Sequence, residues 1–269
     1  MRSWLIVKVV LLALLVNFSA HAATWITSFK NQDSFNRSID TIANGDHQDM
    51  THMLALKCRL SDGKTILSRI AVFQTDDENG LDYALVTGHG LVWMNNKKRK
   101  DSPCIVQDFS GNQRPVLNYA LSDNYKEATQ SDWGIIRFKA MPTKALIRYE
   151  LPHIAWQSLS EERIPVRFAV ARGLKTNAQD CEILPQKYNV LAGHEFKSVV
   201  AHNCQAIGGQ SGSPLSLHAE AKDLLLGIHI GRTWTLNTPI TGKPGFQGFA
   251  RIIDDKMLGD IQKMMKEMH

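Results

Sequence analysis

The chain has 269 residues, of which 43% are hydrophobic and 21% are charged, and its formal net charge is +5 at pH 7. This share of apolar residues excludes an intrinsically disordered protein, and the sequence has no biased or periodic tract of the kind found in collagen, coiled coils or repeat proteins. The length allows one large domain or two small ones.

Residues 1–22 have the pattern of a secretory signal peptide. A basic start at Arg2 precedes an unbroken apolar run at residues 9–16, and Ala-His-Ala at residues 20–22 fits a cleavage site. Lys8 interrupts the apolar stretch, which makes it too short for the ~20 residues of a membrane-spanning helix. We therefore expect an exported protein, periplasmic or extracellular, with no stable membrane insertion after cleavage of the signal.

Residues 23–52 form an N-terminal segment that is largely polar, with a short helical candidate around Ile39 and Ile42. The sequence leaves open whether this segment is a propeptide or an arm of the mature protein.

From residue 53 onward, short apolar runs separated by turn residues dominate, and we interpret them as β-strands. One set lies in a predicted domain at residues 53–145 and a second set in a predicted domain at 146–252. Asp62-Gly63 predicts a hairpin, because both central residues of a type I′ turn need φ > 0. No helical runs alternate with the strands, so antiparallel barrels or sandwiches are favoured over a parallel βαβ sheet. The runs are MLALKCRL, TILSRIAVF, DYALVTG, CIVQDF, PVLNYAL and WGIIRF, followed by IPVRFAVARG, QKYNVLAG, KSVVAHNC, DLLLGIHIG and FQGFARII.

Residues 253–269 have the pattern of an amphipathic helix. Apolar residues recur at steps of three and four after Asp254-Asp255, and acidic residues favour a helix start. We interpret the methionine stripe of this helix as core contact, because thioethers fill irregular gaps between packed layers.

The four cysteines of an exported protein would meet an oxidising compartment, so two disulfides are expected. Of the possible pairings we favour Cys58–Cys104 and Cys181–Cys204, since each bond then closes within one half of the chain. A zinc site is less well supported, because no Cys-x-x-Cys pair occurs and His47 and His52 do not have the spacing of two ligands on one helical face.

The segment CQAIGGQSGSP at residues 204–214 carries the most chemical information. Glycines flank Ser211, as needed where the backbone approaches a substrate closely and the N–H groups of Gly209 and Ser211 point at one oxygen. Taken alone, the motif is explained better as a Gly/Ser-rich surface turn.

Two further residues change that interpretation. His89 ends an apolar run in YALVTGHG, and Asp132 begins another in SDWGIIRF. Singly, a histidine here is equally a hydrogen-bonded core residue and the aspartate equally a turn residue. Jointly, in the chain order His, Asp, Ser, the three are much harder to explain by chance.

In these segments the sequence resembles the trypsin-like (chymotrypsin-fold) serine endopeptidases, and within them the bacterial glutamyl endopeptidase-like branch. The resemblance rests on VTGHG, SDWGII, CQAIGGQSGSP and LLLGIHIGR, a small fraction of the chain. It implies an all-β fold of two antiparallel six-stranded β-barrels with a C-terminal α-helix, in which the three segments meet in the cleft between the barrels.

The resemblance also implies roles for the residues. Ser211 would be the nucleophile that forms an acyl-enzyme, His89 the general base and later acid, and Asp132 the partner that fixes the tautomer of His89. The N–H groups of Gly209 and Ser211 would form the oxyanion hole, each donor being worth ~3 kcal/mol in the transition state. The substrate would be a protein or peptide, and neither a cofactor nor a metal is expected.

The sequence departs from the family pattern at two places. Gly90 follows His89 where many relatives have a cysteine, so the disulfide beside the histidine must be absent or moved, and Cys58–Cys104 would replace it. Gln210 stands where the aspartate of animal trypsins pairs with a new amino terminus, so activation through that ion pair is not expected.

In this family the strand that follows the nucleophile pairs with the substrate backbone, which points to His229, Ile230 and Gly231. Gln205, Ala206 and His229 would line the P1 pocket, which then holds no aspartate suited to Lys or Arg. We hypothesise a preference for Glu or Gln at P1, with Arg232 adding positive potential. A purely structural His229 is an equal alternative.

Two other functions were weighed. An α/β-hydrolase would place its acid after the serine and a glycine where Ser213 stands. A catalytically silent relative would bind peptides or surfaces through the same cleft. Nucleic acid is not expected as a partner, because the basic run at residues 97–100 has no interleaved aromatic residues. The natural substrate and the oligomeric state are left open by the sequence.

Overall fold

The computed structural model describes residues 26–28, 53–59, 65–92, 104–108, 110–127, 129–142, 146–154, 163–172, 175–185, 198–206, 208–219, 222–235 and 245–268. The expected signal peptide, most of the segment 23–52, the Asp62-Gly63 turn, the basic run at 97–100 and the predicted strand QKYNVLAG lie outside these residues.

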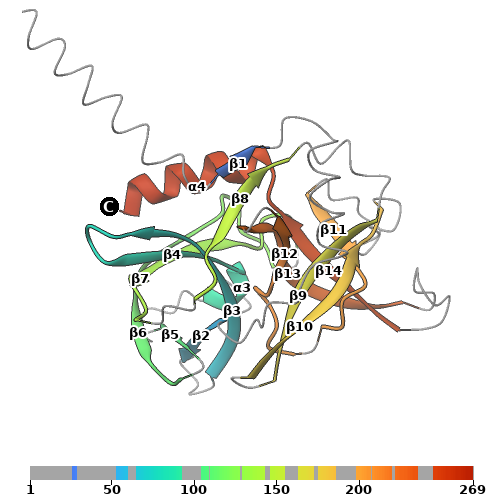
Figure 1. The fold of residues 1–269 in the computed structure, drawn as a ribbon, viewed down its shortest axis with the longest axis horizontal. Coiled ribbons are helices and arrows are strands. Elements are labelled where there is room, and N and C mark those ends of the chain that lie inside the picture. Colours follow the sequence, from blue (N-terminus) through green and yellow to red (C-terminus); the bar gives the residue numbers. More distant parts are fainter. Residues whose placement is uncertain are drawn as a thin grey trace, which may run out of the picture.

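Six antiparallel strands close the first barrel (Figure 1). The strands pair in the order β2-β3-β4-β7-β6-β5, and β5 returns to β2. Their inward residues, among them Leu56, Val72 and Phe138, are fully or almost fully buried in one apolar cluster. The strands are β2 (Leu54–Arg59), β3 (Thr65–Asp76), β4 (Leu81–Val86), β5 (Cys104–Gln107), β6 (Gln113–Leu121) and β7 (Gly134–Lys139).

Six more antiparallel strands close the second barrel. They pair in the order β13-β12-β9-β10-β11-β14, and the β13–β14 pairing completes the ring. These strands are β9 (Ile164–Arg172), β10 (Lys175–Ile183), β11 (Val199–His202), β12 (Pro214–Ala219), β13 (Lys222–Thr235) and β14 (Gly245–Ile252). The all-β fold of two six-stranded barrels, expected from the resemblance, is confirmed.

Two strands outside the rings were not expected from the sequence. β8 (Tyr149–His153) runs parallel to the start of β13, and β1 (Ile26–Ser28) runs parallel to β8. The two strands extend the sheet of the second barrel beyond β13, and β1 lies next to α4 (Figure 1).

The C-terminal helix α4 (Asp255–Met268) fastens the two barrels together. Its buried face shares one apolar cluster with Trp133 and Ile135 of the first barrel and with Ile228 and Phe249 of the second. Asp254 caps the helix, because its Oδ1 accepts a hydrogen bond from the Met257 N–H at 2.8 Å. The predicted amphipathic helix is thus present, and its methionines lie in the core. The buried residues of α4 are Met257, Leu258, Ile261, Met264, Met265 and Met268.

Both disulfides have the pairing favoured from the sequence. Cys58–Cys104 joins directly opposed residues of β2 and β5, and Cys181–Cys204 joins β10 to the segment that leads to Ser211. A Cβ at Gly90 would lie 2.6 Å from Ser68 Oγ, so the backbone beside His89 has no room for a cysteine side chain. In the described part of the chain, no helix has the length and apolar character needed to cross a membrane.

Candidate active site

The register of the first barrel brings His89 and Asp132 together. Val86, the last residue of β4, pairs with Gly134, the first residue of β7, so the residues after β4 lie opposite those before β7. His89 sits in the single helical turn α3 (Gly88–Leu91) directly after β4. Its Nδ1 lies 2.8 Å from Asp132 Oδ2, and its backbone N–H donates to Asp132 Oδ1 at 2.9 Å. Both carboxylate oxygens of Asp132 therefore hold His89.

This arrangement fixes the chemistry of the His89 ring. The Asp132 side chain is fully buried, and the His89 side chain is 12% exposed. A carboxylate beside Nδ1 makes that nitrogen the donor, so the neutral ring keeps Nε2 as a free base. Burial alone would lower the pKa of His89, but the hydrogen bond and charge of Asp132, with the charge of Glu127, outweigh burial and raise the pKa above 6.5.

The turn that carries His89 is packed tightly against the loop that carries Asp132. A Cβ at Gly88 would lie 2.3 Å from Tyr125 Cε2 and 3.3 Å from Asp132 Oδ1. The Tyr125 hydroxyl donates to the Val92 carbonyl at 3.3 Å, on the far side of the same turn. A side chain at Gly88 would separate the two segments, which explains why this position is glycine.

Ser211 lies in a loop that is hydrogen-bonded to both barrels. Its carbonyl accepts from the Arg69 N–H of β3 at 2.7 Å, and the next N–H, of Gly212, donates to the His229 carbonyl of β13 at 2.8 Å. Ser68, beside Arg69, is also the residue against which Gly90 packs. The Ser211 loop and the His89 turn therefore share residues 68–69 of β3 as a common support.

The glycines of this loop have distinct tasks. Gly209 and Gly212 both have φ of +85°, a conformation that residues with a Cβ rarely adopt. A Cβ at Gly212 would lie 2.0 Å from the Arg69 carbonyl oxygen, whereas one at Gly209 would meet only ordinary contacts with Leu67. Among the described residues, the N–H groups of Gly209 and Ser211 donate to no backbone carbonyl.

A second buried histidine, which the sequence interpretation missed, contacts His229. His202, at the end of β11, has its Nε2 2.9 Å from His229 Nδ1, and both rings are almost fully buried. Burial lowers the pKa of His202 to about 3, and burial followed by the charges of His202, His89 and Arg232 holds the pKa of His229 well below 6.5. Both rings are therefore neutral. The only sequence signal was a histidine two residues before Cys204.

Hydrogen bonds hold both rings of this pair in place. The Cys204 N–H donates to His202 Nδ1 at 3.2 Å, so the proton of the neutral His202 ring is on Nε2. His202 Nε2–H can then donate to His229 Nδ1, and the Phe249 carbonyl accepts a hydrogen bond from each of the two rings. The space for the His202 ring comes from Gly248, where a Cβ would lie 2.1 Å from Cε1 of that ring.

The other residues expected near a substrate lie around His229. Ile230 is buried, Gln205 is exposed and Ala206 is partly buried. The Arg232 side chain donates to the Ala206 carbonyl at 3.1 Å, which joins the two segments that hold the expected pocket residues. A Cβ at Gly231 would meet no atom within 4 Å, so the molecule is open above that residue.

Comparison with known proteins identifies the fold. No family model and no curated protein matches the sequence. The solved structure of HL collagenase matches with a TM-score of 0.59 and 16% sequence identity, over 83% of this chain and 98% of that one. At this identity the match establishes a chymotrypsin fold, and the activity has to be argued from the site.

Proposed function

We propose that the protein is an exported serine endopeptidase that uses His89, Asp132 and Ser211 as its catalytic triad. The observation that carries this proposal is the double hydrogen bond from His89 to Asp132, which leaves Nε2 of His89 as a base on the side of the ring away from the carboxylate. Export is supported by the signal-peptide pattern and by the two disulfides.

In the first half-reaction, Ser211 Oγ attacks the carbonyl carbon of the scissile peptide bond and His89 Nε2 takes the hydroxyl proton. The negative charge of Asp132 stabilises the imidazolium that forms. When the C–N bond breaks, His89 returns the proton to the leaving amine, which leaves an acyl-enzyme on Ser211. In the second half-reaction, water takes the place of the amine and the same proton transfers release the acid and the serine.

The oxyanion of each tetrahedral intermediate would accept hydrogen bonds from the N–H groups of Gly209 and Ser211. Their lack of backbone acceptors among the described residues supports this role, as does the left-handed conformation of Gly209, which turns the loop between them. Each donor is worth ~3 kcal/mol of transition-state stabilisation.

The substrate backbone would pair with β13 beyond His229. β12 pairs with β13 only as far as Ile228. At His229 the backbone hydrogen bonds are made instead with Gly212 and Ser213 of the Ser211 loop. Residues 230–235 pair on one side only, with β14, among the described strands. An extended peptide can add to the other side, next to Ser211, with Gly231 leaving room for it.

We also propose that Glu or Gln is preferred at P1. The neutral His229 ring is buried and hydrogen-bonded to His202, and with its proton on Nε2 it would donate to the side-chain oxygen of a Glu or Gln at P1. A buried donor left unpaired by an apolar P1 residue would cost part of the binding energy. The charge of Arg232 favours Glu of the two.

A fluorophosphonate probe tests the triad directly. We expect covalent labelling at Ser211, loss of labelling in Ser211→Ala, and a fall of about 10⁴-fold in labelling rate in Asp132→Asn, because the wrong His89 tautomer is then stabilised. A folded wild-type protein that binds peptides but resists the probe would contradict the proposal and favour the silent peptide-binding alternative.

Cleavage of a peptide library tests the P1 preference separately. We expect cuts after Glu and Gln, and a loss of about 10- to 100-fold in kcat/KM for these substrates in His229→Ala. A profile dominated by Lys, Arg or Phe at P1 would rule this preference out and leave the triad untouched.

A further inference from the structure

We propose that Arg251 is a positioning residue for the catalytic site: its guanidinium fixes the end of the loop that carries Asp132 against the second barrel. This inference rests on the proposed function of Asp132, but the position of that side chain can be measured without any catalysis. The arginine lies in β14, far along the chain from the residue that it positions.

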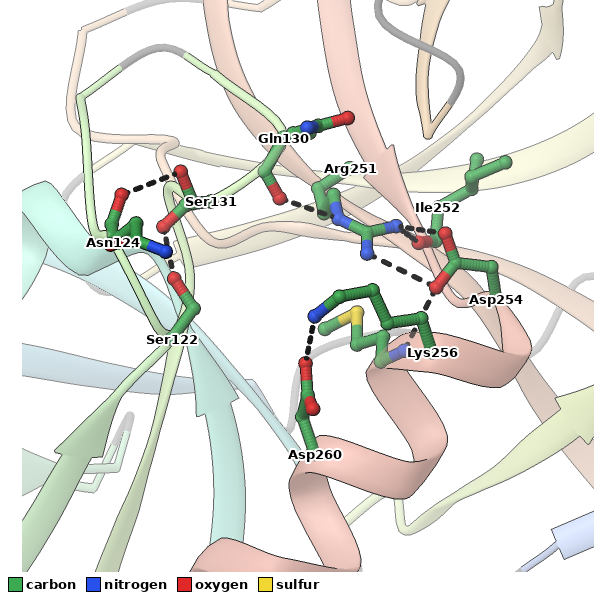
Figure 2. Close-up of polar contacts among 10 residues, drawn as sticks. Ser122, Asn124, Gln130, Ser131, Arg251, Ile252, Asp254, Lys256 and Asp260 are labelled. Atoms are coloured by element: carbon green, nitrogen blue, oxygen red, sulfur yellow. Dashed lines mark hydrogen bonds and ion pairs between the residues drawn. The ribbon is translucent and has the colours of Figure 1, made fainter.

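The buried side chain of Arg251 is the centre of a cluster of polar contacts (Figure 2). Its Nε donates to the Gln130 carbonyl at 2.7 Å, across the boundary between the barrels. Its two terminal nitrogens bind both carboxylate oxygens of Asp254, at 3.0 and 3.1 Å, and one of them also donates to the carbonyls of Ser198 and Ile252. The guanidinium is thus bound to the second barrel through both terminal nitrogens, and its Nε–H donates to the first barrel.

The Asp254 end of the cluster is itself rigid. Asp254 caps α4 through the Met257 N–H, and α4 is buried against both barrels. Burial alone would raise the pKa of Asp254, but the charge and hydrogen bonds of Arg251 outweigh it and lower that pKa, so the carboxylate is ionised at neutral pH. The planar guanidinium donates to both oxygens of this carboxylate at once, whereas the ammonium group of a lysine lacks this two-pronged geometry.

The loop between β6 and β7 makes hydrogen bonds within itself and one to Arg251. Within it, Ser122 and Ser131 are hydrogen-bonded to one another through the Ser131 carbonyl, and the Ser131 hydroxyl donates to the Asn124 carbonyl at 3.1 Å (Figure 2). Asn124 has a φ of 55°, an uncommon conformation for a residue with a side chain. These contacts connect parts of the loop to one another, and the hydrogen bond from Arg251 to the Gln130 carbonyl connects the loop to the second barrel.

Asp132 lies between two anchors as a result. On one side Trp133 is buried in the shared core, and on the other Gln130 is bound by Arg251. The Asp132 N–H donates to the Thr129 carbonyl at 3.0 Å, which links its position to that of the residues around Gln130. Without Arg251, the backbone at Gln130 loses its hydrogen bond to the second barrel, and Asp132 can shift with it. A shift of 1 Å at a catalytic group costs about 100-fold in rate.

The readout is the pKa of His89, measured by NMR titration of ring-labelled histidine in the full-length folded protein. Burial lowers this pKa, whereas the hydrogen bond and charge of Asp132 raise it and the charge of Glu127 adds to that rise. In Arg251→Met we expect the pKa of His89 to fall, the fluorophosphonate labelling rate and kcat to fall by about 10- to 100-fold, and KM to change by less than about 3-fold.

Arg167→Met is the matched control. Arg167 is also a buried arginine in a strand of the second barrel, with its Nε 4.0 Å from Asp180. We expect this variant to lose stability in urea unfolding while the pKa of His89 and the labelling rate stay at the wild-type values. If Arg251→Met does not fold, Arg251→Lys, which keeps the charge but not the fork, should show the same fall in the pKa of His89.

An Arg251 variant that loses stability as Arg167→Met does, yet keeps the wild-type pKa of His89 and labelling rate, would overturn the proposal and leave Arg251 a stabilising residue only. If the wild-type protein itself resists the probe, the proposed function fails, and the titration of His89 still decides whether Arg251 positions Asp132.

Discussion

Gly212 shows how a single residue without a side chain holds the site together. The carbonyl of Arg69 passes within 2.0 Å of where its Cβ would lie, and its φ of +85° is unfavourable for any other residue. From the sequence we expected the glycines that flank Ser211 to let the backbone approach a substrate closely. The structure gives Gly212 a different task, the close approach of the Ser211 loop to β3, which no motif reveals because it depends on a contact between the two barrels.

We predict that Gly212→Ala destabilises the protein by about 2 kcal/mol or more, from a strained backbone and a clash with Arg69, and that it abolishes labelling of Ser211. Gly231→Ala is the control, because a Cβ there meets open space and φ is not in the left-handed region. Urea unfolding should show a loss for the first variant and little change for the second. Equal stability of the two variants would contradict this account.

At the scale of elements, the strands that the sequence predicted are those with a clear hydrophobic pattern. β4 and β7 are examples, and their register alone brings His89 to Asp132. β10 was missed because KTNAQDCEI is mostly polar, and it is a strand because it pairs with β9 along its whole length. β8 was missed because its pairing partners, β1 and β13, are distant in the chain. Pairing between distant segments leaves no local signal.

The residues of the candidate site also fall into those that a local pattern indicates and those that only distant contacts reveal. His89, Asp132 and Ser211 were proposed from recognisable motifs, whereas His202 and Arg251 contact residues far away in the chain. Their sequence surroundings resemble those of any buried polar residue in a strand. Closure of the second barrel places His202 beside His229, and the packing of the two barrels against each other places Arg251 beside Gln130.

The helix α4 contributes to stability through its buried face. We predict that Ile261→Ala, which removes a fully buried side chain from the shared core, costs about 2–5 kcal/mol. Lys256→Ala removes an ion pair whose lysine side chain is 75% exposed and should cost less than about 0.5 kcal/mol. Thermal unfolding of the two variants measures the difference, and similar melting temperatures would show that α4 is not part of the core.

At the scale of the whole molecule, His202 and His229 make the folded protein sensitive to acid. Both have pKa values far below 6.5 when folded, so the unfolded chain binds more protons than the folded one below that pH. Each histidine therefore costs about 1.4 kcal/mol of stability per pH unit as the pH falls below 6.5, until its folded pKa is reached. His89 acts in the opposite direction, because its raised pKa adds stability below 6.5 that is lost as pH rises through its folded pKa.

We predict that the urea midpoint falls between pH 7 and pH 5, and that His202→Gln reduces this fall. His153→Gln is the control, since the His153 side chain is 54% exposed. A pH dependence that is the same in all three proteins would show that the buried pair does not set the acid sensitivity.

The Cys181–Cys204 bond ties the segment that leads to Ser211 to β10, while Cys58–Cys104 lies within the first barrel. We predict that replacing Cys181 and Cys204 by serine lowers the fluorophosphonate labelling rate far more than replacing Cys58 and Cys104, at matched fractions of folded protein. Equal rates in the two double variants would contradict this.

A newly made chain in a reducing cytosol would lack this tether. The Ser211 segment would then acquire its final anchor only after transport, once an oxidant has joined the two sulfurs. For the exported endopeptidase proposed above, this order would couple completion of the Ser211 segment to export.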